Sequence, residues 1–589
     1  MDINYKRDKY LSEFSIKTLE DRYFVDGETS PQEAFARAAK AFADDDAHAQ
    51  RLYDYASKLW FMFSTPILSN GGTKRGMPIS CFLNYVEDSR EGITNHYTEN
   101  AYLSSVGGGV GGCWNEVRSV GSTTSNGSES TGVIPFLKVV DAEMLAFSQG
   151  VTRRGSYAAY LDISHPEVEE FLDVRKPTGG DVNRKSTNLH HGVLLSDEFM
   201  ELIEKATKLE GFDDSWDLID PHSGEVKKTV SAKTLWVKLI QNRVETGEPY
   251  IMFKDTVQEA VPEFQQNLGL TVHHSNLCSE ITLATDKDRT AVCCLSSVNL
   301  EEYDEWKDND DFIPDLVRML DNVIEFFINN APDQLSRASY SAMRERSLGL
   351  GAMGFHAYLQ RHSIPFESAM AKGRNLQMFR RIKGEAVRAT RQLATERGEC
   401  PDGAGYGVRN AHLLAIAPNA SSSIICGNTS PSIEPYRANA FTQKTKSGSS
   451  LLKNEYLEDT LQDLGYDTDD VWKSILTNGG SVQHLEFLDQ WTKDVFKTAV
   501  EIDQRWVIEM AGDRQEFICQ SQSLNVFFPA NISKQELHAV HMMAWKRGVK
   551  TLYYLRSEAM KRAENVSDEV LRQYIFDSID DEGCLACEG

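Results

Sequence analysis

Hydrophobic residues follow two different periodicities along the chain. In PQEAFARAAKAFADDDAHAQRLYDYASKLW (31–60), apolar side chains recur at the three- and four-residue spacing of an amphipathic helix. From Ser64 onward the pattern changes to short apolar runs, glycine-rich turns and intervening helical stretches. The sequence therefore predicts a helical N-terminal region over residues 1–63 and a larger α/β region over residues 64–575.

Two segments predict alternating strands and helices. GVLLS (192–196) is typical of a strand and leads into the helix DEFMELIEKATKL, for which Ser196 is the expected N-cap. Near the end, the predicted strand SLNVFFP precedes a helix that starts with the capping box of Ser533 and Glu536 and stops at Gly548. VKTLYYL is then another predicted strand. This order favours parallel pairing and an α/β architecture.

The composition excludes several classes of partner. The formal charge of −25 and the pI near 5.1 disfavour binding to nucleic acid or to an anionic membrane. No apolar run is long enough to span a bilayer, and MDINYKRDKYLSEF lacks the apolar core of a signal peptide, so we expect a cytoplasmic protein. The acidic stretch 576–589 has little to bury and is expected to be a mobile tail.

The ten cysteines are too sparse for a disulfide scaffold, and most are expected to be small core residues. Cys81 ends a glycine-containing loop in MPISCFL, Cys293 lies in the strand-like run TAVCCLSSVNL, and the tail holds the pair Cys584-x-x-Cys587. No second such pair or nearby histidine completes a zinc site, so we expect no metal ion here. A cysteine pair on a flexible tail is suited to thiol–disulfide exchange.

The segment SNLCSEI carries Asn276, Cys278 and Glu280 on alternate positions. In an extended segment these three side chains lie on the same side of the backbone, which brings an amide, a thiol and a carboxyl together. The segment is therefore a candidate reaction centre.

Taken in order, PISCFL, SNLCSEI, AVCCLS, LYYL and CLAC resemble the motifs of one family, the catalytic large (α) subunit of class I ribonucleotide reductase. The likeness runs from about Ser64 to the C-terminus. It implies a ten-stranded α/β barrel of two parallel five-stranded halves, with a central finger loop that carries Cys278. It also implies that the chain reduces ribonucleoside diphosphates to deoxyribonucleotides, under allosteric control of substrate choice.

The resemblance assigns a role to each residue of the candidate centre. Cys278 would carry a thiyl radical that removes the 3′-hydrogen, Glu280 would accept the 3′-OH proton, and Asn276 would hold the substrate hydroxyls. Cys81 would protonate the leaving 2′-OH and, together with Cys293, supply two electrons. Cys294 directly follows Cys293 and competes for the second role. Cys584 and Cys587 would reduce the resulting disulfide, and thioredoxin or glutaredoxin would recharge them.

Tyr553 and Tyr554 match the family's radical relay, which belongs to class I enzymes. On a regular strand the two rings would point to opposite faces. The relay implies a separate small (β) subunit whose metal cofactor makes the radical, and no cofactor bound in this chain. A class II enzyme would instead use adenosylcobalamin and tolerate Tyr554→Phe. A catalytically inactive, nucleotide-binding regulator on the same barrel is a further alternative.

Other segments match the family's nucleotide sites. The substrate phosphate loop corresponds to Pro418, Asn419, Ala420, Ser421 and Ser422, where Asn419 departs from the usual threonine. Further substrate contacts are expected from Ser64, Thr65 and Ser80.

The resemblance also implies regulation and assembly. Asp88 and Arg118 would bind a specificity effector (a dNTP or ATP) at the interface of a homodimer, and a loop with Gln149 and Arg153 would connect it to the substrate base. Glycines in SSVGGGVGG (104–112) are expected to allow close backbone approach, since the segment lacks a dinucleotide-binding pattern. The region before Thr65 is short for an additional ATP-cone, and we expect none. The compact form resembles phage-encoded members, which would place the protein in the host cytoplasm.

Overall fold

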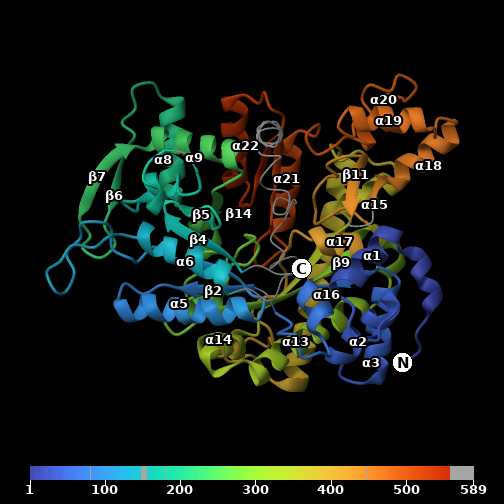
Figure 1. Cartoon of the computed structure of the whole chain (residues 1–589), viewed down its shortest axis with the longest axis horizontal. Helices are drawn as coiled ribbons and strands as arrows, with labels where there is room; N and C mark the ends of the chain where they lie inside the picture. The colour runs from blue at the N-terminus through green and yellow to red at the C-terminus, as the bar shows by residue number, and fades with distance from the viewer. Residues whose placement is uncertain (80, 148–154, 178, 446–447, 558–589) are drawn as a thin grey trace.

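The computed structural model describes residues 1–79, 81–147, 155–177, 179–445 and 448–557. The N-terminal region consists of helices α1 (Glu13–Arg22), α2 (Pro31–Phe42) and α3 (Asp46–Ser57), which lie together beside the barrel (Figure 1). Helix α2 starts with a reciprocal capping box between Ser30 and Glu33, and its buried face carries Phe35 and Phe42. The helical periodicity of this region is confirmed.

Five parallel strands form the first half of the barrel. They are β2 (Cys81–Tyr85), β3 (Gly109–Cys113), β4 (Ser156–Asp162), β5 (His190–Leu195) and β8 (Tyr250–Phe253), paired in this order. The helices α5 (Arg90–Ser105), α6 (Ile134–Ala146), α8 (Asp197–Lys208) and α9 (Ala232–Thr246) connect them and lie on the outside (Figure 1). Ser196 caps α8 as predicted, because its side chain accepts the Phe199 N–H.

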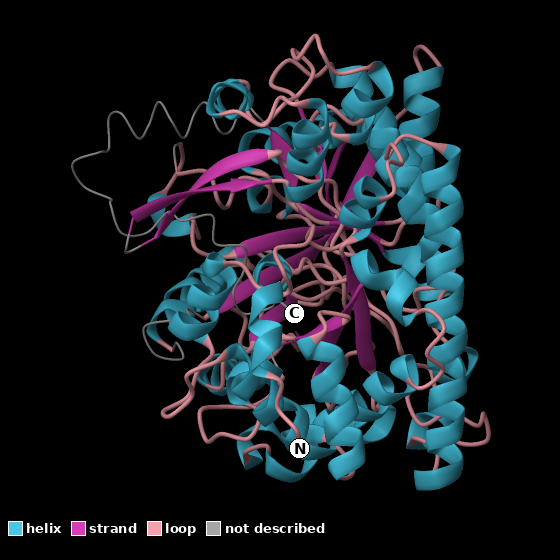
Figure 2. Cartoon of the chain, turned by 90° about the vertical axis from the view of Figure 1, so that its right-hand side faces the viewer, coloured by secondary structure: helices cyan, strands magenta, loops and turns pink. Residues whose placement is uncertain are grey.

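The second half runs antiparallel to the first. Strand β9 (Ala291–Asn299) pairs in parallel with β10 (Leu348–Met353), and parallel bridges continue from Leu350 to Leu414 and from Ile416 to Gln522. Strands β13 (Val526–Phe528) and β15 (Leu555–Ser557) are also parallel. Strand β9 meets β2, and β14 (Thr551–Leu552) meets β8, in antiparallel pairs that join the two halves. Figure 2 shows these strands at the centre, with helices around them.

The predicted α/β barrel is therefore confirmed, and other elements surround it. Strand β1 (Phe61–Phe63) pairs with β9, and a lobe with its own small core contains β11 (Ala440–Thr445), β12 (Gly448–Lys453), α18 (Glu455–Leu464), α19 (Asp469–Thr477) and α20 (Gln490–Val495). The longest helices of the second half are α13 (Phe312–Asn330) and α16 (Ala369–Arg397).

The remaining elements connect these parts: α4 (Thr65–Asn70), α7 (Val168–Phe171), β6 (Ser215–Ile219), β7 (Val226–Ser231), α10 (Lys254–Glu259), α11 (Glu263–Asn267), α12 (Tyr303–Trp306), α14 (Ser336–Glu345), α15 (Phe355–Arg361), α17 (Ala420–Ile425), α21 (Gln504–Gln515) and α22 (Lys534–Lys546). None of the helices in the described ranges is both long and apolar enough to cross a membrane.

The interior of the barrel forms a separate cluster of buried side chains. It contains Cys81, Cys278 and Cys293 together with Tyr250, Tyr553 and Tyr554. The chain between α11 and β9 enters this interior and carries Cys278, as expected for a finger loop.

Candidate active site

The tip of the finger loop is a tight turn rather than an extended segment. Leu277 and Ser279 flank Cys278 in this turn, and Ser279 adopts a left-handed φ of 66°. The alternation expected for SNLCSEI is therefore wrong at the tip, because the loop must reverse direction inside the barrel. Barrel residues hold the turn through its backbone: the Ser523 hydroxyl donates to the Cys278 carbonyl at 2.5 Å, and the Thr551 hydroxyl donates to the Ser279 carbonyl at 2.7 Å.

A glycine on β3 allows the loop to approach the barrel wall. A Cβ placed on Gly111 would lie 2.1 Å from the Ser275 carbonyl oxygen and 2.8 Å from the Asn276 Cα. On the same side, the Tyr160 hydroxyl donates to the Asn276 carbonyl at 2.6 Å. The prediction that glycines in this segment permit close backbone approach is confirmed.

The polar groups of the loop meet Cys81 at the start of β2. The Cys81 thiol donates to Glu280 Oε1 at 4.0 Å, and Asn276 Nδ2 lies 3.8 Å from the Cys81 sulfur. Glu280 Oε2 also accepts a hydrogen bond from the Ser523 hydroxyl at 3.0 Å. Each of Cys81, Asn276 and Glu280 is fully buried. The structure thus brings a carboxyl, an amide and a thiol together, and these groups can exchange protons with a substrate hydroxyl.

Cys81 and Cys293 are directly opposite each other where β2 meets β9. Directly opposed residues of an antiparallel pair have Cα atoms about 4.5–5.5 Å apart, which is within the range that a disulfide spans. Gln520 Nε2 donates to the Cys293 sulfur at 3.5 Å, and burial raises the pKa of this thiol well above its usual value. Cys294 faces the other side of β9, where its thiol donates to the Leu320 carbonyl at 3.4 Å.

Three tyrosine rings contact one another beside the finger loop. The Tyr553 hydroxyl donates to the Cys278 sulfur at 3.6 Å, and the rings of Tyr553 and Tyr554 have centroids 4.2 Å apart. A third ring, Tyr250 on β8, lies 4.8 Å from Tyr553 and 5.2 Å from Tyr554. Burial raises the pKa of Tyr250 and of Tyr554, which keeps both phenols protonated.

The expectation that Tyr553 and Tyr554 point to opposite faces is wrong. The strand is interrupted between β14 and β15, where the Tyr553 N–H donates to the Leu524 carbonyl but the Tyr554 N–H donates to the Asn525 side chain. This departure from a regular ladder lets both rings contact each other.

A polar network next to Tyr554 was not found from the sequence. The Tyr554 hydroxyl lies 3.3 Å from His190 Nδ1, which is itself 2.6 Å from Glu248 Oε1. Arg175 also pairs with Glu248. Burial alone would raise the pKa of Glu248, but Arg175 and His190 outweigh it and hold that pKa well below its usual range. These residues come from separate elements, so local sequence carries no signal that joins them.

The expected substrate loop follows the barrel segment that contains Ile416. Asn419 has a left-handed φ of 56°, a conformation that asparagine tolerates, and its Nδ2 donates to Ser297 Oγ at 2.9 Å. Pro418 precedes it, while Ala420, Ser421 and Ser422 form the first turn of α17.

Ser64 is buried before α4, and the Thr65 hydroxyl contacts that of Tyr23 at 3.0 Å. Asp88 and Arg118 form an ion pair at 2.9 Å, and His222 lies 3.2 Å from the same carboxylate. Ser80, Gln149, Arg153, Cys584 and Cys587 lie outside the described residues.

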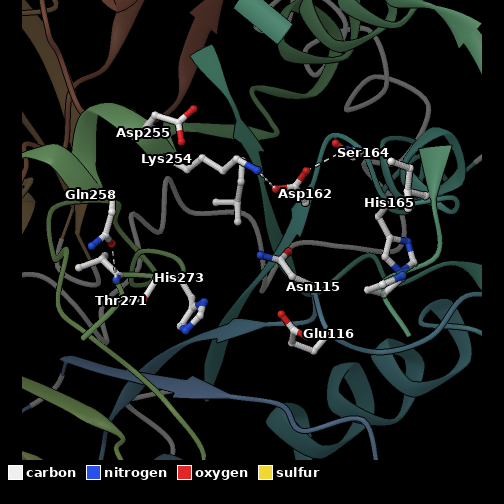
Figure 3. Close-up of a pocket in the computed structure, with 14 residues that line it drawn as sticks. Asn115, Glu116, Asp162, Ser164, His165, Lys254, Asp255, Gln258, Thr271 and His273 are labelled. Carbon is white, nitrogen blue, oxygen red and sulfur yellow. Dashed lines mark hydrogen bonds and ion pairs between the residues drawn. The ribbon is translucent and has the colours of Figure 1, made fainter. Parts of the chain in front are cut away.

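A cavity of about 360 Å³ opens at the carboxyl ends of β3, β4, β5 and β8 (Figure 3). Lys254 and Asp162 face each other in it as an ion pair at 2.6 Å. Thr271 and His273, which lead into the finger loop, complete its lining. The cavity therefore marks the mouth at which the finger loop enters the barrel.

Comparison with known proteins agrees with this architecture. The family model "Ribonucleotide reductase, all-alpha domain" matches residues 9–76, and "Ribonucleotide reductase, barrel domain" matches residues 79–404 and 401–555. The α/β barrel of this chain, with its cysteine-bearing finger loop, is therefore the ribonucleotide reductase fold. The chain belongs to the family of class I ribonucleotide reductase large subunits, which are oxidoreductases.

Relatives cover nearly the full length. A putative ribonucleoside-diphosphate reductase large subunit of Frog virus 3 is 50% identical over 92% of both chains, and the large subunit of Invertebrate iridescent virus 3 is 43% identical over 100% of both. The large subunit of Caenorhabditis elegans is 32% identical over 100% of this chain and 82% of its own length. Among solved structures, the Actinobacillus ureae class Id α subunit matches with a TM-score of 0.83 at 35% identity, covering 95% of this chain and 98% of that one.

Proposed function

We propose that this chain is the catalytic subunit of a class I ribonucleoside-diphosphate reductase, and that Cys278 carries the thiyl radical that starts the reaction. The observation that carries the proposal is the position of the Cys278 sulfur. It lies 3.6 Å from the Tyr553 hydroxyl, in the same buried cluster as Cys81 and Cys293. The Cys278 thiol thus contacts Tyr553, the proposed oxidant, and lies in one cluster with Cys81 and Cys293, the proposed reductants.

Proton movement is assigned to groups that already contact each other. Glu280 accepts the 3′-OH proton after Cys278 removes the 3′-hydrogen, and Cys81 protonates the departing 2′-OH. The 4.0 Å contact from the Cys81 thiol to Glu280, with Asn276 beside both, supports this division. Positioned acid–base groups of this kind contribute about 10²- to 10⁴-fold to rate.

Reduction of the substrate radical leaves Cys81 and Cys293 as a disulfide. Their directly opposed positions support this pair over one that contains Cys294, whose thiol points to α13. Cys584 and Cys587 then reduce the disulfide by exchange, and thioredoxin or glutaredoxin reduces the tail. Under this proposal the chain divides into a helical region (1–63), the barrel (64–575) and a redox tail (576–589).

A separate metal-containing small subunit supplies the oxidising equivalent through Tyr554 and Tyr553. Their ring contact and the link to Cys278 favour this route over a class II reductase, which needs no such path. Thiol–phenol contact allows the hydrogen of Cys278 to pass to an oxidised Tyr553 and to return after turnover.

Nucleotides bind at two further places in this proposal. Pro418, Asn419, Ala420, Ser421 and Ser422, with Ser64, Thr65 and Ser80, hold the substrate. Asp88 and Arg118 bind a dNTP or ATP effector at the interface of a homodimer, and Gln149 and Arg153 connect the effector to the substrate base. The Asp88–Arg118 ion pair supports a common site. The protein acts in the cytoplasm in this proposal, which is the host cytoplasm if the chain is encoded by a virus, as its relatives from Frog virus 3 and Invertebrate iridescent virus 3 are.

The test is CDP reduction by the full chain with dithiothreitol and ATP, in one arm with a class I small subunit and in another with adenosylcobalamin. Product only with the small subunit is expected, and product only with adenosylcobalamin refutes the tyrosine route. Cys278→Ser should abolish turnover while nucleotide binding persists. Cys400→Ser is the matched control, because Cys400 is equally buried but outside the interior cluster. Retained turnover in Cys278→Ser refutes the radical assignment.

A further inference from the structure

Cys519 occupies a site that favours an anion. Its sulfur accepts hydrogen bonds from the successive backbone N–H groups of Leu413 and Leu414 at 3.1 and 3.2 Å. The same sulfur also lies 3.6 Å from the Leu414 carbonyl oxygen, to which the protonated thiol donates. Successive N–H groups that converge on one atom form an anion-binding concavity, so the backbone here stabilises a thiolate.

A buried histidine provides the base for that thiolate. Gln265 Nε2 donates to Glu345, which directs Gln265 Oε1 toward His412 Nε2 at 2.8 Å. His412 must therefore carry its proton on Nε2 when neutral, which leaves Nδ1 as an acceptor. His412 is one of the groups that lower the pKa of Cys519, and its Nδ1 is buried with no hydrogen-bond partner among the described residues. It can take the thiol proton, as in other Cys–His pairs.

Two lysines place positive charge near Cys519. Lys383 extends from α16, and Lys550, just before β14, donates to the carbonyls of Cys519 and Gln520 at 2.6 and 2.9 Å. Burial alone would raise the pKa of Cys519, but Lys383, His412 and the Leu413 amide outweigh it and hold that pKa well below its usual value. Burial also lowers the pKa of Lys550 to about 8.

Cys519 differs in exposure from the other cysteines of the described ranges. Within the described ranges, Cys519 is partly exposed, whereas Cys81, Cys113, Cys278, Cys293, Cys294, Cys400 and Cys426 are all buried. Reactive cysteines combine a lowered thiol pKa with partial exposure to solvent, and inert structural cysteines lack both.

We propose that Cys519 is a thiolate that hydroperoxides oxidise, a redox modification site separate from the cysteines that reduce the substrate. The thiolate attacks the peroxide, so that an S–O bond forms while the O–O bond breaks. Sulfur loses two electrons and becomes a sulfenic acid, and the departing oxygen takes the proton from His412 and leaves as water from hydrogen peroxide or as the alcohol from an organic hydroperoxide. A small-molecule thiol reverses the change through a mixed disulfide and then a second exchange.

Residue-resolved labelling of the full chain tests the site. Iodoacetamide alkylation of each cysteine is followed by peptide mass spectrometry between pH 6 and pH 8, and hydrogen peroxide followed by a sulfenic-acid trap is the second probe. The Cys519 rate is expected to change less than about twofold over this range, whereas a thiol with a pKa near 8.5 changes on the order of 100-fold. A steep profile, or no labelling of Cys519 in the folded chain, overturns the proposal.

Variants identify the groups responsible. Lys383→Met and His412→Phe should each make the Cys519 profile steeper, whereas Lys372→Met, which removes another lysine of α16 that pairs with Glu509, should not. A flat profile in both of the first two variants overturns the assignment. Cys519→Asp keeps an anion opposite the Leu413 and Leu414 amides, so the fold should be retained. The sulfenic-acid label on the peptide that contains residue 519 should disappear in this variant. A label that remains on that peptide refutes Cys519 as the oxidised residue.

Discussion

Replacing Gly111 by alanine should disable the reaction without unfolding the barrel. The added Cβ would lie 2.1 Å from the Ser275 carbonyl oxygen, whereas Cβ atoms essentially never come within 3.0 Å of another heavy atom. The loop must therefore retreat by about 1 Å, and a displacement of this size costs about 100-fold in rate, or about 2.7 kcal/mol of activation free energy. The affected distance is the 3.6 Å contact between Cys278 and Tyr553. The crowding itself should lower stability by about 1–3 kcal/mol.

Two measurements separate these effects. CDP reduction with excess small subunit reports the active-site geometry, and urea unfolding reports the free energy of unfolding. Gly384→Ala is the matched control, because a Cβ there meets nothing within 4 Å and the residue lies in helix α16. The control should keep full turnover and gain up to about 1 kcal/mol of stability. Full turnover in Gly111→Ala would refute the proposed packing of the finger loop against β3. So would a loss of rate that the unfolded fraction of the variant accounts for completely.

Four further substitutions test three separate roles. Glu280→Gln removes the proposed base and should lower kcat about 10²-fold or more with little change in KM, so an unchanged kcat in steady-state assays would contradict the role. Cys293→Ser should abolish turnover supported by dithiothreitol while Cys294→Ser retains it; the reverse result would assign the reductant to Cys294. Asp321→Asn breaks a buried ion pair with Arg346 and should cost about 3–5 kcal/mol in urea unfolding at pH 7. Burial raises the pKa of Asp321, but Arg346 and neighbouring groups outweigh burial and lower that pKa on balance. The ion pair therefore stabilises the fold fully above the unfolded pKa of about 3.9, and this stabilisation is lost as the pH falls through the folded pKa. If Asp321→Asn lowered the free energy of unfolding equally at pH 7 and at pH 2, this reasoning would be wrong.

Local patterns in the sequence predicted those elements whose structure depends on nearby residues. The apolar spacing in residues 31–60 gave helices α2 and α3, and Ser196 and Ser533 cap α8 and α22 as expected. These features depend on contacts within one or two helical turns, which the sequence displays directly. The barrel and its finger loop came instead from the resemblance of separate motifs to a known family.

Contacts between segments far apart in the sequence could not be predicted from local sequence patterns. Period-two alternation alone places Cys293 and Cys294 on opposite faces of a strand, but it does not say which face lies toward Cys81. Only the antiparallel pairing of β9 with β2 decides that. Tyr250 and His190 likewise belong to strands far in sequence from Tyr554, and their contacts with it depend on how the two half-barrels close.

The surroundings of two cysteines differ in the way that their proposed chemistries require. Hydrogen-atom transfer needs a neutral thiol, and nucleophilic attack needs a thiolate. Cys278 is fully buried among apolar and phenolic side chains, and its contact with Tyr553 offers a hydrogen rather than a positive charge. Cys519 instead faces backbone N–H groups, a histidine and Lys383, which favour loss of the proton. Under the two proposals, the barrel interior keeps the Cys278 thiol neutral for hydrogen-atom transfer, whereas the groups around Cys519 favour its thiolate. Moving a lysine into the interior cluster, as in Leu83→Lys, should on this reasoning impair turnover even if the fold survives.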